Sequence, residues 1–291
     1  MIFKRKRFNL LGLYKNALPM LCLFMMSNMH AQKSYQLINS DGIFIEKFDS
    51  SVKSDNRFTS DNIIYKEKGQ YVFDYVYTDS LGRKFLQEIL SEREQNQSRK
   101  WRLIPYDEKN KQTLTKFRLT VLGGLQGFDR FDPDYAQSII KYDYFSDSAA
   151  FDFSENTGLV ENEKNIWFHP PRVMLFRILE LNPFPFIMFP PAEGDSWEWD
   201  LKIGDPWGDE RWRKWQGLIE NKISYSVDST ELIETSFGEL TCTKIVAKAK
   251  SRLGESCLTA FYHTKLGFVR LLYKNINNSC ININLVTYRE L

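Results

Sequence analysis

The sequence predicts a mainly β protein: a curved antiparallel sheet or half-open barrel, built as a meander and covered by one helix. Aromatic residues make up 15% of the 291 residues, with 22 Phe, 14 Tyr and 7 Trp, and such side chains favour pleated, half-buried surfaces. Short segments that alternate apolar and polar residues recur between turn residues. With 43% apolar and 26% charged residues, the composition is that of a globular protein and argues against disorder or a coiled coil.

The first 31 residues have the layout of a secretory signal peptide. Four cations at positions 4–7 precede an apolar run at 17–26, which is about half the length that a helix needs to cross a bilayer. We therefore predict cleavage after Ala31 and an exported protein of the periplasm, cell envelope or exterior, with no integral membrane segment. Cys22 follows Leu21, whereas lipoprotein signals need a small residue before the cysteine, so lipidation is not expected.

Removal of residues 1–31 changes the charge of the protein. The segment carries five cations and no carboxylate, so the formal net charge of +2 becomes about −3 in the remaining chain. An overall basic balance is the only charge argument for nucleic-acid binding, and it disappears with this segment. We expect no nucleic-acid partner.

Residues 32–291 are expected to form a single β-rich domain, in which 32–160 either extend the main sheet or form a second subdomain. Apolar residues alternate around the turn at Asp41-Gly42 and again in three segments separated by turn residues, at 63–66, 70–78 and 84–90, and then at 112–121. The stretch 128–147 is rich in Asp, Tyr and Phe. It lacks the spacing of a calcium loop, and we interpret it as a solvated acidic loop.

One helix is predicted, over 172–181. Pro170 and Pro171 suit a first helical turn, and apolar residues follow at a loose helical spacing. The next segment, 182–191, contains four prolines and must run extended across an apolar surface as a crossover or lid.

Residues 190–291 give the clearest strand pattern. Six alternating segments are separated by gaps short enough for hairpins, at 196–203, 214–227, 240–250, 257–264, 268–274 and 280–288. Such an antiparallel meander needs one face covered, and the helix with its proline-rich extension is the available cover.

Few residues support catalysis. After signal removal only His169 and His263 remain, and Cys257 lies about 20 Å from His263 along one predicted strand, too far for a catalytic pair. Nucleotide, zinc-protease and serine-hydrolase motifs are absent from the sequence. The odd set Cys242, Cys257 and Cys280 leaves at least one free thiol, with any pairing open. We expect no enzyme activity, metal or cofactor.

Two ligand sites are considered, each against plain core packing. Phe184, Phe186 and Met188 could line an apolar pocket under the proline-rich segment, suited to a lipid. The alternative is a glycan-binding or carbohydrate-active site at 195–215, where five tryptophans lie among six carboxylates. In that segment the candidate ligand-binding residues are Trp199, Trp207 and Trp212.

The C-terminal third also resembles known families. Gly194 to Trp197, the strand from Gly238 to Ile245, and the hairpin from Tyr262 to Arg270 are similar to a pattern in exported bacterial proteins of unknown function. Those families resemble the periplasmic lipoprotein carriers, in which a curved, half-open sheet holds acyl chains against a helix-covered concave face. Leu240 departs from the commoner Phe. The resemblance implies an exported, non-enzymatic binding or scaffolding protein with an apolar ligand, or an envelope protein as partner.

Overall fold

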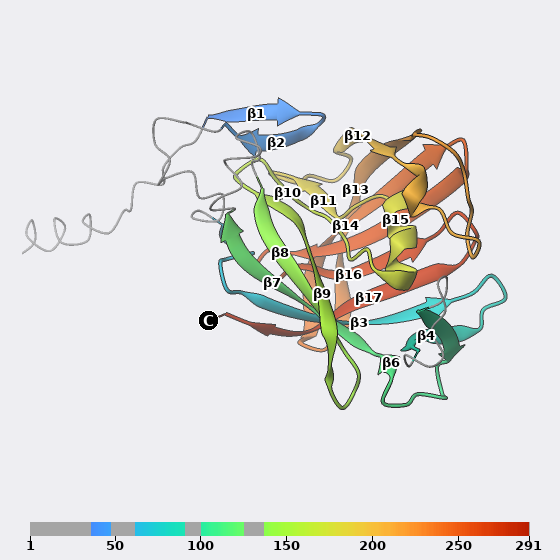
Figure 1. The fold of residues 1–291 in the computed structure, drawn as a ribbon. Helices are drawn as coiled ribbons and strands as arrows, with labels where there is room; N and C mark the ends of the chain where they lie inside the picture. Colours follow the sequence, from blue (N-terminus) through green and yellow to red (C-terminus); the bar gives the residue numbers. More distant parts are fainter. Residues whose placement is uncertain (1–35, 48–61, 91–99, 125–136, 291) are drawn as a thin grey trace, which may run out of the picture. The chain divides into compact units, whose positions relative to one another are not determined.

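The computed structural model describes residues 36–47, 62–90, 100–124 and 137–290. The predicted signal peptide, Cys22 and part of the acidic stretch lie outside these residues. Within them, fifteen strands form one continuous sheet in which every neighbouring pair is antiparallel (Figure 1). The sheet is strongly curved and is not closed by backbone pairing, which confirms the predicted fold class.

The C-terminal half of the sheet is the predicted meander. Its six strands neighbour one another in chain order, and the backbone pairing is most extensive from β13 to β15. The connections after β13 are short, but residues 204–218 join β12 to β13, so the strand predicted at 214–227 begins only at 219. The strands are β12 (Ser196–Ile203), β13 (Ile219–Thr235), β14 (Gly238–Ser251), β15 (Gly254–His263), β16 (Gly267–Lys274) and β17 (Cys280–Arg289).

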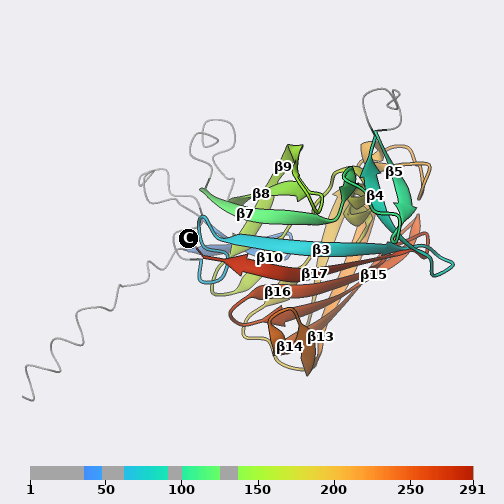
Figure 2. The same cartoon turned by 90° about the horizontal axis from the view of Figure 1, so that it is seen from below.

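Strand β3 (Gln70–Thr78) connects this meander to the rest of the sheet. It pairs with β17 along one edge, with Tyr75 opposite Ile283, and with β7 and β4 along the other. Figure 2 shows β3 lying between β17 and β7. The strands beyond it are β4 (Lys84–Ile89), β5 (Trp101–Pro105), β6 (Thr113–Leu114), β7 (Lys116–Gly124), β8 (Ser138–Phe145), β9 (Ala150–Glu161), β10 (Asn165–Phe168) and β11 (Phe186–Met188).

Strand β8 corrects the expectation of a solvated loop over 128–147. Ser138, Ile140, Tyr142 and Tyr144 are buried on one face, while the intervening side chains lie on the other, more accessible face. The acidic character of the segment misled the prediction: on the strand itself the acidic residue, Asp143, lies on the outer face and pairs with Arg118 and Lys141 at 2.9 and 2.8 Å.

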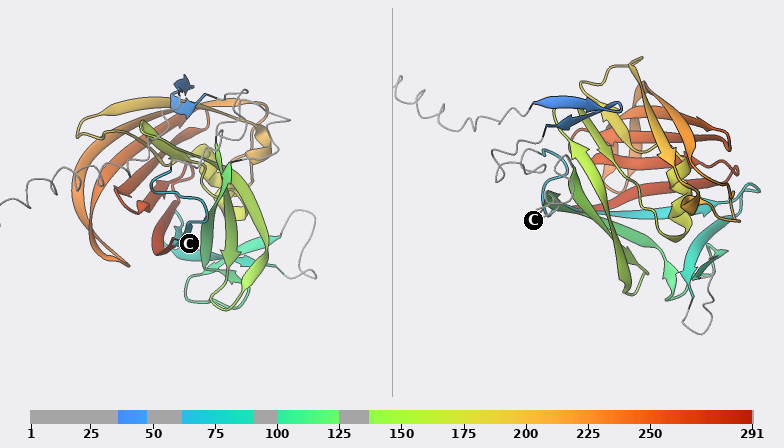
Figure 3. Two further views of the ribbon diagram at one scale, coloured as in Figure 1. Left: turned by 90° about the vertical axis from the view of Figure 1, so that its left-hand side faces the viewer. Right: turned by 45° about the horizontal axis from the view of Figure 1, so that its top comes forward.

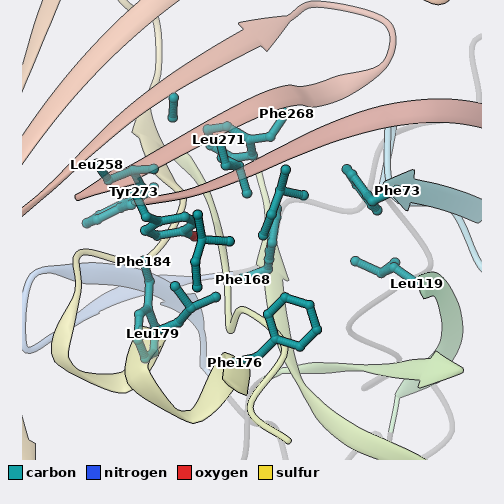
Figure 4. Packing of buried hydrophobic residues seen from close by; sticks show 14 of the residues in the cluster. Phe73, Leu119, Phe168, Phe176, Leu179, Phe184, Leu258, Phe268, Leu271 and Tyr273 are labelled. Carbon is teal, nitrogen blue, oxygen red and sulfur yellow. The ribbon is translucent and has the colours of Figure 1, made fainter. Parts of the chain in front are cut away.

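The concave face of the sheet is covered by a short helix, η3 (Met174–Leu181), and by the chain that follows it (Figure 3). Phe176 packs against Tyr75, Phe117 and Tyr144, with ring centroids 4.9 to 6.3 Å apart. Figure 4 shows Phe176, Leu179 and Phe184 directed toward the side chains of the sheet. The predicted covering helix is therefore present.

The helix differs from the prediction in type and length. It is a 3₁₀ helix, begins at Met174 rather than residue 172, and has no side-chain N-cap. Asn182 ends it in an extended conformation (φ −109°, ψ 163°), because the proline at position 183 disfavours helical geometry in the residue before it. The buried Asn182 amide fixes this end by donating to the Ile178 carbonyl at 3.0 Å and to Asn275 Oδ1 at 2.8 Å.

A separate hairpin, β1 (Leu37–Ser40) and β2 (Ile43–Glu46), contacts strands near both edges of the large sheet. Its turn is the predicted Asp41-Gly42 pair, with φ of 51° and 96°. Phe44 N–H donates to Asn165 Oδ1 on β10 at 2.7 Å. A β-carbon on Gly42 would lie 2.8 Å from the Glu198 carbonyl of β12, so the turn is in close contact with that strand.

Candidate functional site

The two terminal strands of the large sheet, β11 and β12, meet through aromatic side chains. Among the described strands each has only one hydrogen-bonded neighbour, β10 and β13 respectively. Trp167 on β10 contacts Trp199 on β12 edge to face, with centroids 5.7 Å apart, and Phe186 on β11 contacts Trp197 at 5.6 Å. We call this contact the aromatic seam; its members are Trp167, Phe184, Phe186, Trp197 and Trp199.

The seam rests on strand β13. Trp197 stacks on Tyr225 with an interplanar angle of 4° and a centroid distance of 5.5 Å. The Tyr225 hydroxyl donates to the Phe184 carbonyl at 3.1 Å, and burial raises the pKa of Tyr225 well above its ordinary value, so the hydroxyl stays protonated. This bond fixes the proline-rich segment against the inner face of the sheet.

The structure brings together three of the six candidate ligand-binding residues at this seam. The ring centroids of Phe184 and Trp199 are 5.2 Å apart, and the Phe186 ring contacts that of Trp197. Phe184 and Phe186 are 1% and 0% exposed, so at these positions their rings fill the interior instead of bordering open space. Met188, half-buried, pairs with Asn165 at the end of β11.

Two donors at the seam have no acceptor among the residues that the structure describes. Nε1 of Trp167 and Nε1 of Trp197 are buried, and neither donates a hydrogen bond within the part of the chain that the structure describes. Sequence reasoning missed Trp167. The signal was available in the run Asn165 to Phe168, whose lack of alternation indicates a strand buried on both faces.

A pair formed by the half-buried His169 and the buried Glu180 connects the seam to η3. His169 Nε2 is 3.2 Å from Glu180 Oε1, and Nδ1 is 2.8 Å from the Pro170 carbonyl oxygen. Because the carbonyl only accepts, Nδ1 must donate to it. The imidazole also lies 4.5 Å from the Phe184 ring.

The other two candidates, Trp207 and Trp212, lie together away from the seam, in the connection between β12 and β13. The Trp212 indole donates to the Trp207 carbonyl at 3.3 Å. Two guanidinium groups flank the half-buried Trp207 ring, that of Arg172 at 5.8 Å and that of Arg177 at 5.5 Å. This ring is therefore already in contact with cations of the same chain.

A pocket of about 480 Å³ lies next to these tryptophans, between β5 and the chain at 208–214. Its aromatic wall is Trp101, whose face is covered by the Arg211 guanidinium 3.7 Å from the ring centroid. Arg211 also binds both oxygens of Asp209 at 2.8 Å. Burial opposes ionisation of Asp209, but the Arg211 hydrogen bonds outweigh it and hold the pKa of Asp209 below its usual range.

All three cysteines of the predicted mature chain are free thiols. Cys257 and Cys280 both neighbour Lys274 in the sheet, on opposite sides, which places their Cα atoms about 10 Å apart and beyond reach of a disulfide. Cys242 is buried, which raises the pKa of its thiol to about 11. In the described ranges no cluster of three or more metal-binding side chains occurs. No helix within those ranges has the length and apolar character to cross a membrane.

Comparison with known proteins gives distant structural similarities only. No protein-family model and no curated protein matches the chain. One similar solved structure is a protein from Bacteroides fragilis, proposed to be exported, with a YmcC-like fold; it is 12% identical, has a TM-score of 0.42, and the match covers 79% of this chain and 99% of that one. A protein from Parabacteroides distasonis, proposed to be a lipoprotein, is 15% identical with a TM-score of 0.42, covering 78% and 97%.

The hypothetical lipoprotein YmcC from Escherichia coli is more distant, with 8% identity, a TM-score of 0.30 and coverage of 76% and 86%. Scores of this size assign neither a function nor a ligand to the chain. The sequence pattern in the C-terminal third therefore stays a prediction.

Proposed function

We propose that the protein is an exported, non-enzymatic component of the cell envelope that binds an apolar ligand at the aromatic seam. The observation that carries the proposal is the contact between β11 and β12, which is made by rings and not by a backbone ladder. Export is proposed from the cationic and apolar layout of residues 1–31.

Ring contacts suit a site that opens. An edge-to-face aromatic pair contributes about 0.5–1.5 kcal/mol beyond its buried area, and an acyl chain can replace that contact with apolar contacts of its own. Opening the seam between these two strands breaks no strand-to-strand hydrogen bond among the described residues. Next to it, the buried ring of Tyr225 extends the apolar interior.

We also propose that the protein has no catalytic role, because neither described histidine is placed as a free acid or base. Of the two described histidines, His169 has both ring nitrogens close to protein oxygens. His263 Nδ1 accepts the Lys265 N–H at 3.3 Å, on a surface turn.

The glycan-binding alternative receives less support. A sugar would need an accessible aromatic face, but Arg211 covers Trp101 and two arginines flank Trp207. The nearby carboxylates are engaged as well, Asp209 with Arg211 and Glu210 with Lys214.

Photolabelling tests the proposal and separates the two sites. The purified protein is irradiated with a fatty acid that carries a diazirine in its alkyl chain, and labelled peptides are mapped by mass spectrometry. We expect saturable labelling in 165–169 and 184–199, unchanged in Trp207→Ala. Labelling confined to 205–215, or none that saturates, contradicts the proposal.

A further inference from the structure

The seam contains two hydrogen-bond donors for which the described residues supply no acceptor. Nε1 of Trp167 and of Trp197 are buried without an acceptor in the residues that the structure describes. Most buried polar groups in proteins are hydrogen-bonded, so each exception calls for a partner from outside the chain or a specific cost. Outside the seam, the Trp212 indole donates to the Trp207 carbonyl at 3.3 Å, whereas Nε1 of Trp215 is also without an acceptor among the described residues.

Both donors belong to residues that neighbour Phe186. Trp167 is the cross-strand partner of Phe186 in the β10–β11 pair, and Trp197 contacts Phe186 from β12 with centroids 5.6 Å apart. Phe186 is fully buried. A ligand that takes the place of the Phe186 ring at the seam would therefore contact the Trp197 indole and lie next to the strand position of Trp167.

Resting on the proposed function, we propose that the ligand is an acyl lipid whose carbonyl oxygen accepts from the Trp167 and Trp197 indoles. A pure hydrocarbon would leave both donors unsatisfied, whereas an acyl carbonyl supplies an acceptor with two lone pairs next to an apolar chain. The surrounding rings make an ionised headgroup unfavourable at this depth, because burial of an unpaired charge is costly. A carboxyl group of a fatty acid and an ester of a glycerolipid share this carbonyl.

The test compares three ligands of equal chain length: lauric acid, methyl laurate and dodecane. Each displaces the fluorescent apolar probe N-phenyl-1-naphthylamine from the purified protein. The variants are Trp167→Phe, Trp197→Phe and the double variant, which keep an aromatic ring and remove the N–H. Trp215→Phe is the matched control, because its Nε1 is also buried without an acceptor among the described residues but lies outside the seam.

We expect the acid, the ester or both to bind the unmodified protein more tightly than dodecane. Each seam variant should lose about tenfold affinity for the carbonyl ligands, with dodecane binding unchanged and Trp215→Phe without effect. Binding of the acid alone identifies a free fatty acid, and binding of both extends the site to acyl esters. Thermal unfolding confirms that the variants are folded.

Two other outcomes are distinguishable. If all three ligands bind equally and the seam variants change nothing, the carbonyl inference is wrong while the apolar site stands. If neither the probe nor any ligand binds the folded protein, the proposed function itself is wrong.

Discussion

The hydroxyl of Tyr65 occupies the space that a side chain on Gly267 would need. A β-carbon at position 267 would overlap the Tyr65 hydroxyl and lie 2.7 Å from its ring carbon Cζ. The same hydroxyl accepts the Phe268 N–H at 3.0 Å, and Tyr65 is fully buried. The β15–β16 turn is thereby joined to a residue that precedes Phe268 by 203 positions in the chain.

Gly267→Ala is therefore expected to destabilise the protein by about 2–4 kcal/mol, from overpacking against Tyr65 and from a backbone φ of +72°. Gly217→Ala is the matched control, since φ is +69° there and a β-carbon at that position would have no atom within 4 Å. Gly217→Ala should lower the free energy of unfolding by only about 1 kcal/mol. Urea unfolding measures both, and equal losses would show that the Tyr65 contact is unimportant.

Glu161 holds the segment that carries Tyr65. Its Oε1 accepts the N–H groups of Ile63 and Ile64 at 2.8 Å, and its Oε2 accepts that of Tyr65 at 2.7 Å. Glu161→Gln replaces one acceptor oxygen by an amide donor that faces an N–H, so we expect a loss of about 2–3 kcal/mol in unfolding free energy. Glu163→Gln, an exposed neighbour, should change it little; a similar loss in both would refute this role.

Asp209 gives a pH-dependent prediction. Its pKa is lowered, so the folded state favours the carboxylate; the stabilisation is present above the ordinary value of 3.8 and is lost as pH falls through the lowered pKa. Since the Asp209–Arg211 pair is partly exposed, Asp209→Asn should lower the free energy of unfolding by less than about 1 kcal/mol at pH 6 and should leave it unchanged near pH 2. Denaturant unfolding at both values measures this. A difference that persists at low pH would contradict it.

The limits of the sequence are visible in particular residues. Alternation in Gln70–Thr78 identifies a strand and its buried face, but a period of two does not say which strand lies beside it. The pairing of Tyr75 with Ile283 is therefore available only from the structure. For the same reason, the sequence identifies Phe186 and Trp199 as apolar candidates but does not show that their strands meet through ring contacts. The contacts of Trp167 with Trp199 and of Phe186 with Trp197 are seen only in the structure.

The free cysteines predict a labelling order. Cys242 is buried with a thiol pKa of about 11, so little of it is thiolate at neutral pH. Cys257 and Cys280 are partly accessible on the outer face. Iodoacetamide at pH 7.5 should modify those two first and Cys242 only after denaturation, as followed by peptide mass spectrometry. Early labelling of Cys242, or a disulfide between Cys257 and Cys280, would contradict the arrangement.

Tyr75 stabilises the fork in the sheet, where β4 pairs with β3 at its start and with β6 further along. The Tyr75 hydroxyl accepts the Gln87 N–H at 2.9 Å and donates to the Leu114 carbonyl at 3.0 Å, so it connects two residues that lie opposite each other in the β4–β6 pair. Burial raises the pKa of Tyr75, so the donor is retained at ordinary pH. Tyr75→Phe leaves two buried backbone groups unpaired and should cost about 2–4 kcal/mol.

The fork also reaches η3, because the Gln87 side chain accepts the Leu175 N–H at 2.9 Å. We therefore expect Tyr75→Phe to speed hydrogen exchange at both Gln87 and Leu175, whereas Tyr77→Phe, two residues along the same face, should leave both unchanged. Hydrogen exchange followed by mass spectrometry of peptides covering 84–90 and 172–181 measures this. If only the first peptide exchanges faster, the fork does not support the covering helix, and η3 is held by its other contacts, among them those of Phe176 with Tyr144 and Phe117.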